Sequence, residues 1–214
     1  MSKVRVNCFS VSLDGFGAGP NQSLENPLGE RGPELHQWFF PTKTFQTTVL
    51  GQKDGATGVD NDMAVRSFEN VGAWILGRNM FAHSRGPWPE NDSWQGWWGD
   101  APPYHCDVFV LTHYPRASFT LDDTTFHFVT DGIASALARA KASAKGKDVR
   151  IGGGAATIRQ YLQGGLIDEM HLAVGPVILG KGEPLLQGID LPALGFTNVK
   201  LIHGEGASHY WLSK

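Results

Sequence analysis

The sequence predicts an α/β fold with a largely parallel central sheet, helices on both faces and a closing antiparallel hairpin. Short apolar runs alternate with amphipathic segments of about ten residues, a pattern typical of strands joined by crossover helices. The segment 148–162, DVRIGGGAATIRQYL, shows one such unit directly, because a strand-like run gives way to three glycines and then to helical periodicity. Two apolar runs flank 203–207, HGEGA, which predicts the hairpin. A length of 214 residues suits one large domain, 1–214.

The first half of the chain contains two runs that fit strands and two segments with helical periodicity. Residues 4–12 alternate in part and then become apolar, and residues 73–76 form a short buried run, so both are predicted strands. Helices are predicted over 34–40 and 60–69, the second with an N-cap. The polar, glycine-containing segment 46–58 is expected to be a mobile loop or an insertion.

The same alternation continues to the C-terminus. A long loop over 87–104 carries four tryptophans, and Asp131 is expected to cap the helix that follows it. The remaining predicted strands are 107–111, 126–129, 149–151, 169–179, 199–203 and 208–212. The remaining predicted helices are 133–145 and 156–162, and 77–81 is a second strand-to-helix joint.

Composition excludes several classes of function. Eighteen basic and 21 acidic side chains give a net charge of −3, so there is no broad positive field to hold nucleic acid or an anionic membrane surface. No signal-like core or run of roughly 18 apolar residues occurs, and we expect a cytoplasmic protein. Two cysteines are too few for a disulfide framework. The spacing of His105, Cys106 and His113 fits no zinc pattern, so no metal is expected.

The three consecutive glycines are the most informative local feature. Without side chains at Gly152, Gly153 and Gly154, another molecule can approach the backbone, and the first amides of the next helix point outward unpaired. Such a helix start attracts phosphate groups. A tight strand-to-helix connection would use the same glycines, and the motif is not GxGxxG.

Two other strand exits carry cations. Arg78 lies in the first turn of a predicted helix, where the helix dipole disfavours a cation unless an anion lies in front of it. The alternative is a surface arginine paired with a carboxylate. Thr112, His113 and Arg116 could bind a phosphate, and a solvated loop would explain them equally well. In a parallel sheet these exits meet at one edge, where ligands bind.

Six stretches occur in the order of a known family: SVSLDGF, ILGRNMF, PPYHCDVFVLTH, FVTDGIASAL, IGGGAATIRQYL and HLAVGPVILGKGEPLL. The chain resembles the dihydrofolate reductase superfamily, in particular the branch related to the C-terminal reductase domain of the bifunctional riboflavin-biosynthesis deaminase-reductase. The resemblance spans nearly the full length and implies the three-layer dihydrofolate reductase-like fold.

The resemblance also implies a bound NADPH. Its pyrophosphate would lie over the glycine turns, its 2′-phosphate near the cationic exits, and its nicotinamide near the end of the first strand and the helix entry at 155–156. The extra phosphate would suit the additional cations, so NADPH is expected rather than NADH. The cofactor-binding residues expected on this basis are Val11, Gly77, Arg78, Asn79, Thr112, His113, Arg116, Gly152, Gly153, Gly154, Ala155, Ala156 and Thr157.

Hydride transfer demands positioning more than acid or base groups, so few catalytic side chains are expected. Asp14 is the candidate catalytic residue, and its alternative role is to initiate a turn. Trp38 would form an aromatic wall, and Gly180 resembles a loop residue near the substrate. Trp94, from the tryptophan-rich loop, would either close over a flat heterocycle or contact a second subunit, with ordinary loop packing as a lesser alternative.

We therefore expect an NADPH-dependent reductase acting on a small heterocycle of the pyrimidine or pterin type, in a homodimer. The nearest named reaction is reduction of 5-amino-6-(5-phosphoribosylamino)uracil. Dihydrofolate reduction is an alternative, although Glu34 is too near its helix start to match the acidic residue of dihydrofolate reductases. A nucleotide-binding sensor or scaffold without catalysis is the other.

Overall fold

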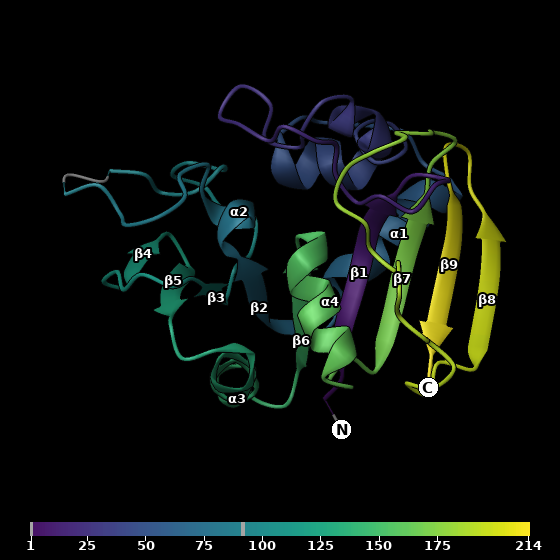
Figure 1. The fold of residues 1–214 in the computed structure, drawn as a ribbon. Coiled ribbons are helices and arrows are strands. Elements are labelled where there is room, and N and C mark those ends of the chain that lie inside the picture. The colour runs from purple at the N-terminus through teal and green to yellow at the C-terminus, as the bar shows by residue number, and fades with distance from the viewer. Residues whose placement is uncertain (1, 91–92) are drawn as a thin grey trace.

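A computed structural model describes residues 2–90 and 93–214 (Figure 1). Nine strands form one sheet in the order β4-β5-β3-β2-β6-β1-β7-β9-β8. Its centre is parallel, since β1 pairs with β6 and β7, and β2 pairs with β3 and β6. The strands are β1 (Val4–Val11), β2 (Val71–Gly77), β3 (Asp107–Leu111), β4 (Phe119–Leu121), β5 (Thr124–Val129), β6 (Asp148–Gly153), β7 (Glu169–Val174), β8 (Asn198–His203) and β9 (Ser208–Ser213).

Both edges of the sheet are antiparallel. β9 pairs antiparallel with β7 and with β8, which confirms the predicted hairpin. At the other edge β4 pairs antiparallel with β5, and this strand was not predicted. It has only three residues and turns back through Asp122 at a φ of 51°, so it is too short to show alternation.

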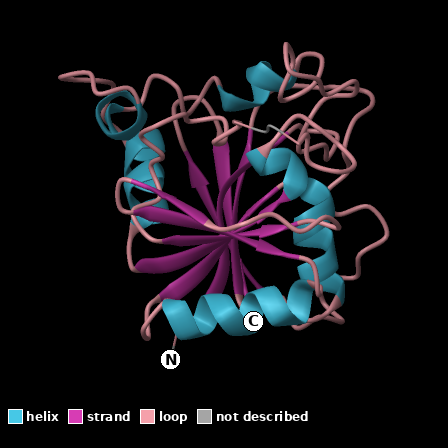
Figure 2. Cartoon of the chain, turned by 90° about the vertical axis from the view of Figure 1, so that its left-hand side faces the viewer, coloured by secondary structure: helices cyan, strands magenta, loops and turns pink. Residues whose placement is uncertain are grey.

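Helices cover both faces of the sheet, as predicted (Figure 2). Ala73 and Ile75 of β2 pack in one apolar cluster with residues of α3 (Ile133–Ser143) and α4 (Ala155–Gln163). Trp74 and Leu76, whose side chains point to the opposite face, pack with Phe81 of α2 (Arg78–Phe81). Figure 1 shows α1 (Val59–Phe68) behind β1 and α4 in front of β6. None of the described helices is long and apolar enough to span a bilayer.

Three predicted elements differ from the structure. The helix expected over 34–40 is a short 3₁₀ helix, η1 (Gly32–His36), because Pro33 starts it and turns follow it. The loop expected from residue 46 begins with a π-helical turn, η2 (Phe45–Val49). The strand expected over 169–179 ends at Val174, since Gly175 and Pro176 follow and proline cannot donate a ladder hydrogen bond.

Both predicted caps also differ from the structure. α1 begins at Val59, so Asp60 lies inside its first turn, and Gly58 is the N-cap residue. α3 has Gly132 as N-cap and no side-chain cap, while Asp131 lies one position earlier and bonds to Ser135. Residues 91 and 92 of the predicted tryptophan-rich loop lie outside the described residues.

Candidate functional site

The three strand exits singled out by the sequence lie side by side. Leu76 at the end of β2 pairs with Gly153 of β6, and Gly77 pairs with Leu111 at the end of β3. The glycine turn, the start of α2 and the polar exit of β3 therefore meet at one edge of the sheet. This edge carries the carboxyl ends of parallel strands, where α/β sheets bind ligands.

The turn between β6 and α4 leaves two amides available. Gly154 is the N-cap of α4 and gives it no side-chain cap, and the Gly153–Gly154 peptide is cis. The carbonyl of Gly154 accepts the amides of Thr157 and Ile158 over 3.0 and 3.1 Å. Within the described part of the chain, no group accepts the amides of residues 155 and 156. Such a helix start suits an anion.

The glycines of this edge serve two different purposes. A Cβ at Gly77 would overlap the hydroxyl of Thr157, and one at Gly152 would crowd the side chain of Leu76. At Gly153, φ is +121° and a Cβ would lie 2.9 Å from the ring of Phe9. These three glycines are required by packing. A Cβ at Gly154 would meet nothing within 4 Å, so this glycine alone borders open space.

Arg78 is held by the exits of β2 and β3. It donates to Thr112 Oγ1 and to Ser84 Oγ, each over 3.1 Å. Its guanidinium carbon lies 3.1 Å from the centre of the Trp88 ring, a cation–π contact. Arg116 lies 4.8 Å from the same ring and donates to the carbonyl of Trp94 over 2.6 Å. The two cations therefore share one aromatic neighbour beside the glycine turn.

The tryptophan-rich loop folds back on this edge. Trp94 Nε1 donates to the carbonyl of Phe81 over 2.7 Å, and Trp97 Nε1 donates to that of Asn79 over 3.1 Å. Trp88 Nε1 bonds the carbonyl of Tyr114, next to the exposed His113. These contacts are ordinary loop packing. That was the lesser alternative expected for this loop, after a contact with a flat heterocycle and a contact with a second subunit.

Asp14 links two loops at the ends of β1 and β7. Its carboxylate oxygens accept the amides of Leu179, over 3.1 Å, and Gly180, over 2.6 Å. Burial acts to raise the pKa of Asp14, but hydrogen bonds from Ser12 and from these amides outweigh it and lower the pKa. Asp14 is therefore negatively charged at neutral pH and holds the two loops together, three residues after the buried Val11 that ends β1.

Trp38 is buried and does not face an open cleft. It is 4% exposed, donates from Nε1 to Ser10 Oγ over 2.9 Å, and packs edge-on against His209 at 5.0 Å between ring centres. Trp38 therefore lies beside a buried chain of hydrogen bonds that the sequence did not predict.

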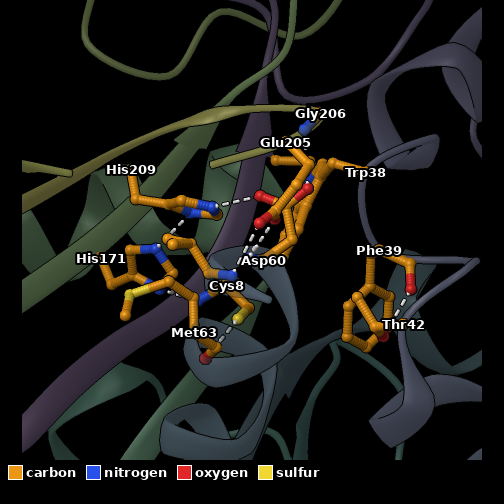
Figure 3. Close-up of polar contacts among 12 residues, drawn as sticks. Cys8, Trp38, Phe39, Thr42, Asp60, Met63, His171, Glu205, Gly206 and His209 are labelled. Atoms are coloured by element: carbon orange, nitrogen blue, oxygen red, sulfur yellow. Dashed lines mark hydrogen bonds and ion pairs between the residues drawn. The ribbon is translucent and has the colours of Figure 1, made fainter. Parts of the chain in front are cut away.

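This core chain of hydrogen bonds joins β1, β7, β9 and α1 (Figure 3). The amide of Cys8 donates to His171 Nδ1 over 3.2 Å, and His171 Nε2 lies 3.0 Å from His209 Nδ1. His209 Nε2 lies 2.8 Å from one oxygen of Asp60, whose other oxygen accepts the amide of Gly206 over 2.7 Å. We call these five residues the histidine relay. Both imidazoles are at most 1% exposed.

The ends of the histidine relay fix its protons. Because the Cys8 amide is a donor, His171 must accept at Nδ1 and carry its hydrogen on Nε2. His209 then accepts at Nδ1 and donates from Nε2 to Asp60. Burial is the largest cause that lowers the pKa of His171 to about 3, and the positive charge of Arg150 adds to it. The hydrogen bonds thus leave one hydrogen on each imidazole, and both oxygens of Asp60 act as acceptors.

The β8–β9 loop supplies the cap that α1 lacks in its own sequence. The Glu205 carboxylate accepts the amides of Val59 and Asp60 over 3.0 and 2.9 Å. A Cβ at Gly58 would overlap this carboxylate, and one at Gly204 would overlap that of Asp60. For the histidine relay, the sequence signal was a histidine inside each of two apolar strands, but the hydrogen-bond partners lie up to 149 positions apart.

The structure does not bring together the His105, Cys106 and His113 considered from the sequence. Among the described residues, His105 lies instead with Asp122 and Asp123, all exposed, with possible ligand atoms within 4.8 Å of one another. His105 Nδ1 is 2.8 Å from Asp123 Oδ1, a contact that a hydrogen bond explains without a metal.

Two curated proteins of Bacillus subtilis (strain 168) resemble the chain in sequence. Uncharacterized protein YyaP is 28% identical over 134 residues, 59% of this chain and 66% of that protein. Uncharacterized protein YwjB is 29% identical over 119 residues, 55% of this chain and 60% of that protein. The matches therefore span 66% and 60% of the two relatives, less than two thirds of either length.

Solved structures share the fold at low sequence identity. A protein named for riboflavin biosynthesis from Shewanella sp. PV-4 has a TM-score of 0.56 at 20% identity, covering 100% of this chain and 98% of its own. Dihydrofolate reductase from Enterococcus faecalis, complexed with NADP(H), has a TM-score of 0.52 at 12% identity, covering 98% and 94%. The deaminase/5-amino-6-(5-phosphoribosylamino)uracil reductase from Thermotoga maritima has 0.51 at 12%, covering 99% of this chain but 56% of its own.

These structures confirm the predicted dihydrofolate reductase-like fold. The sequence profile of the RibD C-terminal domain matches residues 3–208, nearly the whole chain, which confirms the resemblance read from its motifs. The chain belongs to the RibD C-terminal domain family.

Proposed function

We propose that this chain is an NADPH-dependent reductase that delivers hydride to a small heterocycle of the pyrimidine or pterin type. Membership of the RibD C-terminal domain family and the fold shared with reductases support an oxidoreductase of this kind. The observation that carries the proposal is the start of α4, where two amides without an acceptor in the described chain lie beside two arginines on neighbouring strand exits.

The residues at this edge fit a dinucleotide. The open space at Gly154 and the amides of Ala155 and Ala156 suit a pyrophosphate bridge. Arg78 and Arg116, with the exposed His113, suit the additional 2′-phosphate of NADPH. When bound, the cofactor supplies the hydride, and the protein supplies position and charge.

On the substrate side, we assign Asp14 a positioning role. Its anionic carboxylate holds the amide of Gly180 and so fixes the loop after β7 against the end of β1. Trp94 would close the tryptophan-rich loop over a bound heterocycle while its indole nitrogen keeps the hydrogen bond to Phe81. A homodimer and a cytoplasmic location stay predictions.

Turnover distinguishes the alternatives. A reductase should oxidise NADPH in the presence of at least one pyrimidine or pterin acceptor, followed as loss of cofactor absorbance. Oxidation with dihydrofolate alone would assign the chain as a dihydrofolate reductase. Cofactor binding without turnover on any acceptor would favour a nucleotide sensor and overturn the enzyme proposal.

Ala156→Glu should weaken NADPH binding by about tenfold or more without destabilising the fold. Ala156 is exposed in the first turn of α4, where a carboxylate stabilises a helix but repels a phosphate. The control is Gln160→Glu, which adds the same charge on an exposed position one turn later. Calorimetric titration gives both affinities. Equal affinities in the two variants would show that the pyrophosphate does not bind at this helix start.

His113→Glu should weaken NADPH binding about fivefold and leave NADH binding nearly unchanged. His113 is exposed beside Thr112, so the new charge would face the 2′-phosphate without disturbing packing. His203→Glu, at an exposed position at the end of β8, is the control. Parallel losses for both cofactors would argue against a 2′-phosphate contact at the exit of β3.

A further inference from the structure

A second hollow lies away from the proposed cofactor edge. It is a groove of about 590 Å³ between α1 and the segment that precedes β3, with Trp74 of β2 in its lining. Lys147 directly precedes β6, and His105 lies just before β3, so this end of the groove is at the amino ends of the parallel strands. The glycine turn lies at the opposite, carboxyl end of β6. The groove is therefore a separate feature of the molecule.

The groove has an aromatic lining backed by a buried cation. Trp74 lies between Tyr104, at 5.0 Å, and Phe68, at 6.3 Å between ring centres. The guanidinium of Arg150 lies 4.0 Å from the centre of the Trp74 ring and is 8% exposed. Burial lowers the pKa of Arg150 to about 10, so it stays charged at neutral pH. Within the described chain it pairs with carbonyl oxygens and with no carboxylate.

The rim of the groove is cationic and rich in donors. None of the described residues that line it is acidic, although the whole chain carries a net charge of −3. Lys147 forms no ion pair with any described residue, whereas Lys43 lies 3.9 Å from the exposed Asp54. Thr44 donates to the carbonyl oxygen of the Asn61 side chain, which leaves the amide nitrogen of Asn61 as a donor in the lining.

We propose that this groove binds an aromatic or heterocyclic anion. The ring of Tyr104, which packs edge-on against the buried Trp74, would contact the flat part of the ligand, and Lys147 would hold its acidic group. The volume is within the range of small-molecule sites, and Lys147, which has no ion-pair partner among the described residues, sets the sign of the ligand's charge. This inference goes beyond the proposed reductase activity and does not depend on it.

Two fluorescent probes with the same ring system test the charge preference. 8-Anilinonaphthalene-1-sulfonate carries a sulfonate, and N-phenyl-1-naphthylamine does not. The groove should bind the sulfonate probe about tenfold more tightly, and added salt should weaken only that probe. Equal affinities, or affinities that salt leaves unchanged, would reduce the binding to apolar adsorption and overturn the proposal.

Two matched lysine variants test where the acidic group of the ligand binds. Lys147→Glu should weaken the sulfonate probe about tenfold and change the neutral probe little, whereas Lys141→Glu on the exposed side of α3 should change neither. Both lysines are exposed, so both variants should fold. Equal losses in the two variants would show a general charge effect and contradict a site at Lys147. Displacement of the probe by NADPH would contradict its separation from the cofactor edge.

Discussion

Asp60→Asn is expected to lower the free energy of unfolding by about 3 kcal/mol, although the two side chains have nearly the same shape. The four links of the histidine relay each need one proton, and two backbone amides and two neutral imidazoles supply four. An amide group in place of the carboxylate brings extra protons. Either His209 or the Gly206 amide then faces another donor, and changing the imidazole tautomers only moves that clash along the chain.

Asp62→Asn provides the control for this substitution. Asp62 lies in the same first turn of α1 but is exposed, so it loses the same helix-dipole interaction without breaking a buried chain. Urea unfolding of both variants measures the difference, with a change of at most about 0.5 kcal/mol expected for Asp62→Asn. Equal effects would mean that the polarity of the histidine relay contributes nothing to stability.

The site at the sheet edge could be predicted because its signals are local. The glycines and the change of period from strand to helix within 148–162 mark a joint in any fold, and parallel strand order brings such joints to one edge. The role of each glycine depends on the atoms that surround it in the fold, and the sequence alone does not show those contacts. Gly77 faces Thr157, 80 positions later in the chain, whereas Gly154 borders open space.

The histidine relay could not be predicted, because its members come from four separate elements. A single histidine in the apolar run EMHLAV or in SHYWLS fits a satisfied core residue as well as a network. Only the antiparallel register of β7 and β9 brings His171 and His209 within 3.0 Å. The cap from Glu205 is hidden for the same reason, since helix-start signals are read from neighbouring residues.

Acidification is expected to destabilise the wild-type protein through His171. The pKa of His171 is lowered from 6.5 to about 3 in the folded protein, first because burial disfavours the charged ring and then because of nearby cations. The unfolded chain therefore binds more protons between these values, so this contribution to stability is complete above pH 6.5 and is lost as pH falls. The loss approaches about 1.4 kcal/mol per pH unit, or about 2 kcal/mol at pH 5.

His171→Gln should remove that part of the pH dependence. Glutamine does not titrate here, and its amide still offers one acceptor and one donor, so it avoids the fifth proton that an imidazolium would add to the four links. The variant should be less stable at pH 7 because it packs less well, yet lose about 2 kcal/mol less than wild type between pH 7 and pH 5. His203→Gln, at an exposed position, should keep the wild-type slope. Wild type and His203→Gln keep the proton that the unfolded chain takes up at His171, and His171→Gln lacks it. Identical slopes of stability against pH in all three proteins would therefore assign the acid sensitivity to the carboxylates.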